Sequence, residues 1–319
     1  MIETVNGRVS SSALGTTLMH EHVIVMTPEM QQNFWHWDRE SVINDAIQKL
    51  ADLKAVGIDT IVDLTVLLMG RDVATLKEVA RSSPLNVLVA TGFYVQHDLP
   101  PYLRTRTAES LHLQEDPLVS MLVSDIREGI AGTGVKAAVI KATSDRDGLT
   151  HDVDRCLRAA ARAHRLTGAP ISTHSHSHSR GGLEQQRVFR EEGVDLGRVV
   201  IGHSGDTSDI GYLEELIDQG SLIGMDRFGL APPSLAERAD VVAQMCGKGY
   251  ADRMVLSHDS YCSNDWIPAE MAADQPDWHL LHISHQVLPA LRDRGVTEQQ
   301  LHQMLVSNPR QFLDANELY

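Results

Sequence analysis

The most constraining feature of the sequence is a strand-like segment followed by a helix-like segment, repeated eight times along 319 residues. The strand-like segments are short and rich in Val, Ile and Leu without alternation, which is typical of parallel strands buried on both faces. We predict strands at 18–23, 60–65, 86–94, 136–143, 170–175, 198–203, 221–227 and 253–259. We predict helices at 41–56, 71–81, 116–131, 150–167, 182–192, 209–219 and 235–247, with more helix after 278.

Eight such units predict an α/β fold of the (β/α)8 or TIM-barrel type, with an open doubly wound sheet as the alternative. No glycine-rich dinucleotide or phosphate loop follows the first strand, which removes the usual reason for the open sheet. The sequence also contains no linker or low-complexity stretch. We therefore predict one barrel domain over residues 1–319.

Composition argues against several classes of partner. The net charge of −15 disfavours nucleic acid and anionic membranes, which need clustered Lys and Arg. No apolar run approaches the ~18 residues of a membrane span, and residues 1–11 lack a signal-peptide core.

The three cysteines, Cys156, Cys246 and Cys262, lack disulfide-framework spacing, which fits a reducing compartment. We expect a soluble cytoplasmic protein, and we do not expect Cys262 to act as a nucleophile, because no sequence feature suggests an activating base beside it.

Side chains that can bind metals stand at the carboxyl ends of five predicted strands, where barrel enzymes place their active sites. They are His20, His22, Lys141, His174, His203 and Asp259. His20 and His22 are two residues apart, so on a strand both imidazoles face the same side. Each residue also has an ordinary structural interpretation, since such a histidine often bonds to a carbonyl and such an aspartate often caps a helix. Their joint position favours a metal site.

Lys141 does not fit this cluster as an ammonium, because cations would repel it and burial would be costly. Either it turns outward, or carbon dioxide carboxylates it to an anion whose two oxygens can each hold a metal. With Asp259, a carboxylated Lys141 would give two anionic groups and four imidazoles for two divalent cations. These donors suit zinc, cobalt, iron and manganese alike.

The motifs around these residues resemble those of the phosphotriesterase-like lactonases in the amidohydrolase superfamily. The motifs follow the family order across nearly the whole chain: LMHEHV at 18–23, VIKAT at 139–143, ISTHS at 171–175, GLEQQR at 182–187, VIGHSGDT at 200–207, MDRFGL at 225–230 and SHD at 257–259. The resemblance implies a barrel with a binuclear metal centre, a small-molecule substrate and a homodimer. The Trp-rich segment 33–37 is a candidate dimer contact, or else packs within the monomer.

The resemblance also assigns metal ligands residue by residue. It implies that His20, His22 and Asp259 hold the more buried metal, and that His174 and His203 hold the more exposed one. N6-carboxylated Lys141 and a hydroxide would bridge the two. The alternating run 174–178 permits a slipped assignment to His176 or His178. The preceding Thr173 and the distance to GLEQQR match the family with His174 as ligand, so we assign His176 and His178 to a loop.

Two further residues match positions of the family's active site. Tyr94 matches an aromatic residue that, as a tyrosine in the lactonase branch, contacts the bridging hydroxide and the substrate. Its alternative is a packing role at the edge of the core. Arg227 matches an arginine at the edge of the site, for which an ion pair with Asp226 or another acid is the alternative. Dedicated phosphotriesterases of the family carry a tryptophan where Tyr94 stands.

The expected activity is hydrolysis of an N-acyl-homoserine lactone, with Asp259 as the proton carrier and a secondary organophosphate triesterase activity. The alternatives are a dedicated phosphotriesterase and a non-catalytic metal-binding barrel. A mononuclear deaminase is a further alternative, which would not need Lys141 as a bridge. The loops at 231–234 and 260–266 differ from lactonases, so the resemblance does not carry a preference for one acyl chain.

Overall fold

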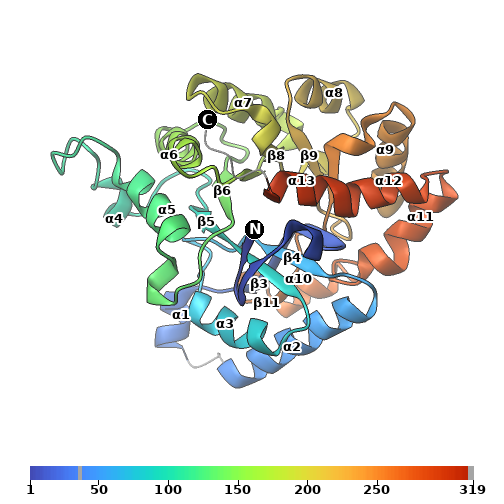
Figure 1. Ribbon diagram of the computed structural model, residues 1–319, viewed down its shortest axis with the longest axis horizontal. Coiled ribbons are helices and arrows are strands. Elements are labelled where there is room, and N and C mark those ends of the chain that lie inside the picture. Colours follow the sequence, from blue (N-terminus) through green and yellow to red (C-terminus); the bar gives the residue numbers. More distant parts are fainter. Residues whose placement is uncertain (35–37, 315–319) are drawn as a thin grey trace.

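The computed structural model describes residues 1–34 and 38–314 (Figure 1). Within them, nine strands form one parallel sheet in the order β10-β9-β8-β7-β6-β5-β4-β3-β11. The strands are β3 (Thr17–Val25), β4 (Thr60–Asp63), β5 (Asn86–Gly92), β6 (Val139–Thr143), β7 (Ile171–His174), β8 (Val199–Ile201), β9 (Leu222–Met225), β10 (Met254–Leu256) and β11 (Tyr261–Asn264). The chain is a TIM barrel, as its strand and helix pattern predicts.

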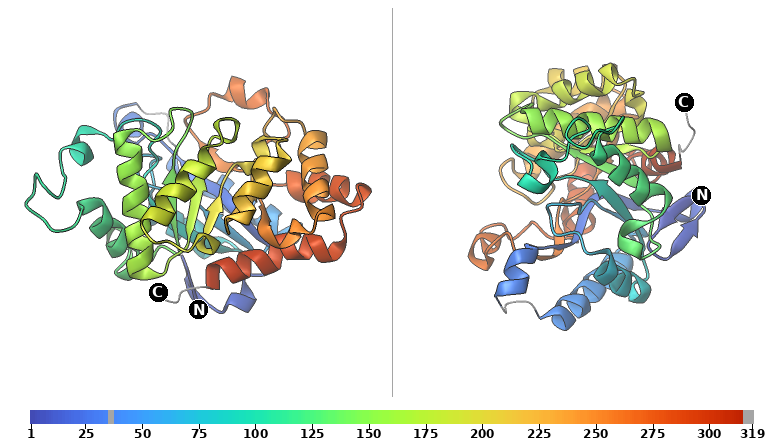
Figure 2. Two further views of the ribbon diagram at one scale, coloured as in Figure 1. Left: turned by 90° about the horizontal axis from the view of Figure 1, so that it is seen from above. Right: turned by 90° about the vertical axis from the view of Figure 1, so that its left-hand side faces the viewer.

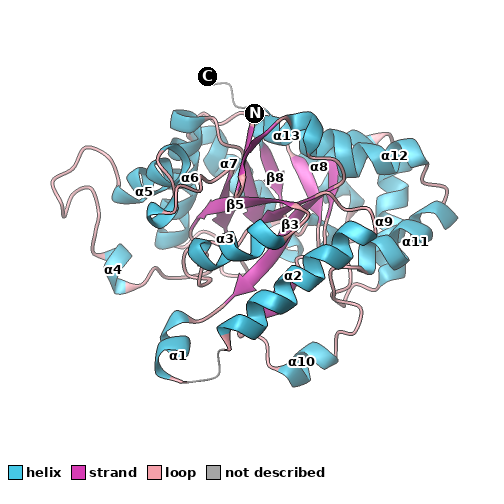
Figure 3. Cartoon of the chain, turned by 60° about the horizontal axis from the view of Figure 1, so that its bottom comes forward, coloured by secondary structure: helices cyan, strands magenta, loops and turns pink. Residues whose placement is uncertain are grey.

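Helices surround the strands (Figure 3). Those that follow the barrel strands are α2 (Arg39–Ala55), α3 (Val73–Ser82), α5 (Pro117–Arg127), α6 (His151–Thr167), α7 (Gly181–Glu191), α8 (Ile210–Asp218) and α9 (Leu235–Gly247). Each lies within a few residues of its predicted range. Helix α2 begins after Asp38, whose side chain accepts a hydrogen bond from the Ser41 amide and so caps the helix. Among the described residues, no helix combines the length and apolar character that crossing a membrane requires.

The remaining helices lie in loops and in the tail. They are α1 (Pro28–Asn33), α4 (Pro101–Arg104), α10 (Ala269–Ala273), α11 (Leu288–Asp293), α12 (Glu298–His302) and α13 (Asn308–Asp314). Helices α1 and α10 follow β3 and β11, so they lie beyond the carboxyl ends of these strands (Figure 3). The helical tail agrees with the prediction. Residues 35–37, the centre of the predicted dimer contact, lie outside the described residues, so the homodimer stays a prediction.

The opposite end of the barrel is closed by both ends of the chain. An antiparallel hairpin of β1 (Ile2–Thr4) and β2 (Gly7–Val9), which the sequence pattern did not predict, lies near α13 (Figure 2). Ile2 and Phe312 pack into the cluster that fills the barrel interior. The Ser11 hydroxyl also donates to Asp314 at 2.6 Å. This closure leaves the carboxyl ends of the strands as the open face.

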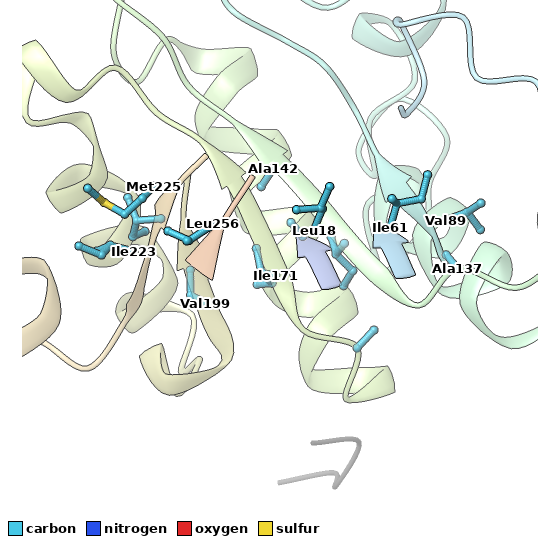
Figure 4. Packing of buried hydrophobic residues seen from close by; sticks show 14 of the residues in the cluster. Leu18, Ile61, Val89, Ala137, Ala142, Ile171, Val199, Ile223, Met225 and Leu256 are labelled. Atoms are coloured by element: carbon cyan, nitrogen blue, oxygen red, sulfur yellow. The ribbon is translucent and has the colours of Figure 1, made fainter. Parts of the chain in front are cut away.

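Apolar side chains fill the spaces on both sides of the sheet. One cluster lies between strands and helices, and Figure 4 shows part of it, including Leu18, Ile61, Ile171, Ile223 and Leu256. The other fills the barrel interior and includes Met19, Val62, Leu88, Val139 and Val255. Burial on both faces explains why the strands lack polar alternation.

An extra residue in β3 reverses the direction of its side chains. Leu18 pairs with Ile61, but Glu21, three residues further on, pairs with Asp63, only two residues further on. This is a β-bulge. Leu18 packs toward the helices. In a regular strand, His20 and His22 would lie on the same face as Leu18 and would also point toward the helices. Because the bulge shifts the register by one residue, both histidines turn into the barrel and Glu21 turns outward.

The predicted eighth strand is wrong at its end. It stops at Leu256, and the chain bends at Asp259, whose φ of 54° is left-handed, before it resumes as β11. Strand β10 pairs with β9, whereas β11 pairs with β3. The barrel therefore closes through two short strands joined by a bend, and this bend carries Asp259.

Glu21 holds this bend in place. Its Oε1 accepts hydrogen bonds from the Ser257 hydroxyl (2.9 Å), the His258 amide (2.9 Å) and His258 Nδ1 (2.7 Å), and its Oε2 accepts one from the Ser260 amide (3.0 Å). The Ile283 amide donates to His258 Nε2 at 2.9 Å, so the ring proton is on Nδ1. The fully buried carboxyl group of Glu21 thus joins β3, the first strand of the barrel, to the bend between β10 and β11.

Replacing Glu21 should therefore destabilise the barrel. We expect Glu21→Ala to lower the free energy of unfolding by roughly 3 kcal/mol or more, because four buried donors lose their acceptor. Urea denaturation followed by circular dichroism measures this change. The control is Glu78→Ala, which removes an exposed pair with Arg39 and should have little effect. Equal stability of the two variants would contradict the role of Glu21.

Candidate metal centre

The six predicted metal ligands lie together at the carboxyl ends of the strands. They come from five parts of the barrel: His20 and His22 from β3, Lys141 from β6, His174 from β7, His203 from the turn after β8 and Asp259 from the bend after β10. Most of them line a cavity of about 150 Å³, to which Tyr94 and Arg227 also contribute. All four histidines and Lys141 are buried.

Donor atoms on the inner side of this cluster lie within contact distance of one another. Asp259 Oδ1 lies 3.3 Å from His20 Nε2 and 3.1 Å from His22 Nε2. Lys141 Nζ lies 2.8 Å from the same His20 nitrogen. Donor atoms of His20, His203 and Asp259 all lie within 4.8 Å of one another, a group that could hold a metal ion. Imidazole and carboxylate donors at this density suit a divalent transition metal.

The outer side of the cluster is formed by His174 and His203. Nδ1 of His174 lies 2.8 Å from Nε2 of His203, and the rings meet edge to face. Gln185 of the GLEQQR motif fixes His174 from behind, because its amide donates to the His174 carbonyl (2.6 Å) and to the Ser144 hydroxyl (2.8 Å). His176, in contrast, contacts Ser179 in the following loop. Of the alternating histidines, His174 is the one that faces the cluster.

Each histidine is also held at its other ring nitrogen. Asp226, at the end of β9, accepts from Nδ1 of His20 at 2.8 Å and from Nδ1 of His203 at 3.0 Å. Nδ1 of His22 lies 2.9 Å from the Thr65 hydroxyl, and Nε2 of His174 donates to Asp145 at 3.1 Å. One nitrogen of each ring is thereby fixed and the other faces the donor atoms of the cluster, as is typical of histidines that bind metals.

Sequence reasoning missed these outer partners. It treated Asp226 only as a possible partner of Arg227. In the structure Arg227 instead donates to Asp259 Oδ2 at 2.9 Å and to Asp206 at 3.0 Å. The position of Asp226 near the carboxyl end of the predicted strand 221–227 was a signal that it belongs to the site.

Burial keeps the imidazoles of His174 and His203 in the neutral form that binds metals. It lowers the pKa of His174 to about 4 and the pKa of His203 well below its usual value, so both rings are neutral near pH 7. Burial also lowers the pKa of the Lys141 ammonium to about 8. It would raise the pKa of Asp259, but the neighbouring His20 and His203 outweigh this effect and hold that pKa well below its usual range.

Tyr94 forms part of the cavity wall. Its ring lies 5.7 Å from the His174 ring and 5.5 Å from the Trp266 ring, measured between centroids. The ring also packs against the cluster in the barrel interior. Burial raises the pKa of its hydroxyl to about 12. Cys262 is buried in the cluster between strands and helices, and burial raises the pKa of its thiol to about 12, which disfavours the reactive thiolate.

Comparison with known proteins identifies the family. Residues 1–313 match the model of the phosphotriesterase family. The chain belongs to this family. It is 50% identical over 318 residues to a phosphotriesterase homology protein of Mycobacterium tuberculosis, and the aligned region covers 98% of this chain and 97% of that protein. It is 36% identical over 311 residues to an aryldialkylphosphatase of Saccharolobus solfataricus, covering 95% and 96% of the two chains.

A solved structure agrees with this assignment. The phosphotriesterase from Mycobacterium tuberculosis superimposes with a TM-score of 0.97 at 49% identity, covering 100% of this chain and 99% of that one. The chain is therefore a hydrolase of the metal-dependent phosphotriesterase family, as the motifs imply. The expected binuclear centre fits the donors present, because four imidazoles, each with one nitrogen turned inward, and the Asp259 carboxylate converge beside Lys141.

Removing the outer partner of two histidines should weaken metal binding. We expect Asp226→Asn to lower metal affinity by about 10- to 100-fold, because His20 and His203 lose their shared carboxylate. Competition with a chelating dye measures the affinity, and circular dichroism checks the fold. Thr65→Val, which removes the outer partner of a single histidine, His22, should cost less. Wild-type affinity in Asp226→Asn would show that this carboxylate does not support the site.

Proposed function

We propose that this protein is a binuclear metal-dependent lactonase that acts on N-acyl-homoserine lactones, with a secondary organophosphate triesterase activity. The observation that carries the proposal is the convergence of four imidazoles, Asp259 and Lys141 on one cavity that has Tyr94 in its wall. In this proposal the substrate is a small molecule whose reactive carbonyl enters the cavity beside these side chains.

We assign the metal ligands as the family motifs imply. His20, His22 and Asp259 would hold the more buried cation, and His174 and His203 would hold the more exposed one. N6-carboxylated Lys141 would supply an anionic oxygen to each. Carboxylation would replace the ammonium that lies 2.8 Å from His20 Nε2 by an anion, which removes the repulsion between Lys141 and the cations. When bound, the two cations would make hydroxide available near neutral pH and polarise the reactive oxygen of the substrate.

We assign the transfer of the proton in this reaction to Asp259, as the family resemblance implies. Its Oδ1 faces the histidines, while Arg227 holds Oδ2 and fixes the orientation of the carboxylate. Asp259 takes the proton of the nucleophile as the nucleophile's oxygen bonds to the carbonyl carbon. The ring carbon–oxygen bond then breaks, and Asp259 delivers the proton to the departing ring oxygen. The product is the open-chain hydroxy acid.

The rest of the cavity supports a substrate with a polar head and an apolar tail. Away from the predicted metal ligands, most of its lining is apolar or aromatic, including Met69, Leu230, Trp266, Ile267 and Trp278, with Arg227 and Asn264 as polar members. An acyl-homoserine lactone has this division, and so does an aryl phosphotriester. Tyr94 favours the lactone, because dedicated phosphotriesterases of the family carry tryptophan there. The relative named aryldialkylphosphatase supports phosphotriester hydrolysis as the second candidate.

A paired measurement tests the substrate. Turnover of an acyl-homoserine lactone and of an aryl phosphotriester is measured on one metal-quantified sample, before and after chelation. We expect the lactone to be preferred, both activities to be lost on chelation, and both to return with added metal. Preference for the phosphotriester would overturn the substrate assignment. Two bound metals without turnover of either compound would overturn the proposed function.

The bridging role of Lys141 is tested separately. We expect Lys141→Ala to lose most bound metal and activity, and a short carboxylic acid in the buffer to restore part of both by replacing the bridging carboxylate. Elemental analysis and turnover are the measurements. Lys248→Ala, which removes an exposed lysine paired with Glu214, is the control and should retain both. Two metals per chain and full activity in Lys141→Ala would contradict the binuclear model and favour a site that does not need this lysine.

A further inference from the structure

Gln96 is a side chain at the rim of the cavity that no motif singles out. It is exposed and follows Tyr94 by two residues, just after β5. Its Nε2 lies 2.9 Å from the Tyr94 hydroxyl oxygen and 2.9 Å from Asp145 Oδ2. The same Oδ2 accepts the hydrogen bond of His174 Nε2. Gln96 therefore connects the tyrosine in the cavity wall to the outer partner of a predicted metal ligand.

The orientation of the Gln96 amide follows from these contacts. An ionised carboxylate only accepts hydrogen bonds, and Asp145 already accepts from His174 Nε2 and from the Arg146 amide. The Gln96 group that faces Asp145 must therefore be the NH2. Its two hydrogens serve its two partners, one for Asp145 and one for Tyr94. The Tyr94 oxygen is thus an acceptor toward Gln96.

This contact determines what the Tyr94 hydroxyl can do. A phenol has one proton to donate. Because Gln96 donates to the Tyr94 oxygen, the Tyr94 proton is not used in that contact. Because burial raises the pKa of Tyr94, the hydroxyl stays protonated near neutral pH. The proton is then available to a group inside the cavity. Without Gln96, the hydroxyl would be free to rotate and to point its proton toward Asp145 and away from the cavity.

The backbone between the two residues is held firmly. The Val95 amide donates to the Thr143 hydroxyl at 2.9 Å, and the same hydroxyl donates to the Val95 carbonyl at 2.6 Å. Tyr94 and Gln96 flank Val95 on either side in the chain. Thr143 thus fixes where the two side chains start, and the Gln96 amide fixes the direction of the hydroxyl.

We propose that Gln96 is a positioning residue that directs the Tyr94 hydroxyl proton into the cavity, toward the substrate oxygen that gains negative charge during hydrolysis. This inference rests on the proposed function, in which Tyr94 contacts the substrate. A fixed donor aimed at developing charge lowers the barrier more than a donor that must reorient.

The test replaces the donor that faces the Tyr94 hydroxyl by an acceptor while keeping a side chain of nearly the same size. Gln96→Glu replaces the NH2 by an acceptor oxygen, so Tyr94 donates to the new carboxylate and no longer into the cavity. Gln96→Met removes the contact. We expect kcat to fall by about 10- to 100-fold in Gln96→Glu and by a few-fold in Gln96→Met, with KM and metal content changed less than twofold. Gln48→Glu is the matched control, because Gln48 also donates to an aspartate but lies on the exposed side of α2.

A double-mutant cycle separates this role from a general effect on the site. In a Tyr94→Phe background the phenol is absent, so Gln96→Glu should change kcat by less than twofold. A loss as large as in the wild-type background would overturn the proposal, since the effect would then pass through Asp145 and His174 and not through Tyr94.

A spectroscopic readout makes the test independent of the substrate. The ultraviolet resonance Raman difference spectrum between wild type and Tyr94→Phe reports whether this phenol accepts or donates hydrogen bonds. In the wild type we expect the difference spectrum to show a phenol that accepts a hydrogen bond. For Gln96→Glu, the difference spectrum is taken against the double variant Gln96→Glu/Tyr94→Phe, and we expect it to show a phenol that donates. Identical spectra would overturn the role of Gln96. If neither substrate is hydrolysed but the spectra differ as expected, the proposed function fails while the positioning of Tyr94 stands.

Discussion

One extra residue in β3 decides both how this barrel closes and where its reactive side chains point. Because the bulge shifts the pairing between Leu18 and Glu21, the two histidines beside Glu21 enter the barrel and the carboxyl group of Glu21 leaves it. Glu21 then holds the bend that carries Asp259. The same register shift therefore builds the inner half of the site and fastens the last strand to the first.

The site that results collects buried charge that must be balanced. Asp226 lies between His20 and His203 and accepts a hydrogen bond from each, while Arg227 holds Asp259. Removing such groups from water is costly unless each has a partner. The partners also fix the tautomers, because a ring that donates outward presents its other nitrogen inward. Stability and metal-binding competence thus depend on the same hydrogen bonds.

The rim of the cavity adds a second level of organisation. Tyr94, Gln96, Asp145 and His174 form a chain of contacts that runs from the cavity wall to the outer partner of a predicted metal ligand. Tyr94 and Gln96 follow β5, Asp145 follows β6, and His174 is the last residue of β7. Such a chain can couple the direction of a single hydroxyl to the geometry of the centre, which is how a common barrel can be adapted to one substrate class.

By itself, the sequence determined the barrel and most of its element boundaries, since periodicity and strand-end turns are local properties. It also predicted that His20, Lys141 and Asp259 would meet, because the carboxyl ends of parallel strands share one face. Only the tertiary structure decided the bulge in β3, the split eighth strand and the partners Asp226, Asp145 and Gln96. The hydrogen bond between His20 and Asp226 spans 206 residues. Its formation depends on strand register and side-chain direction, which no local pattern specifies.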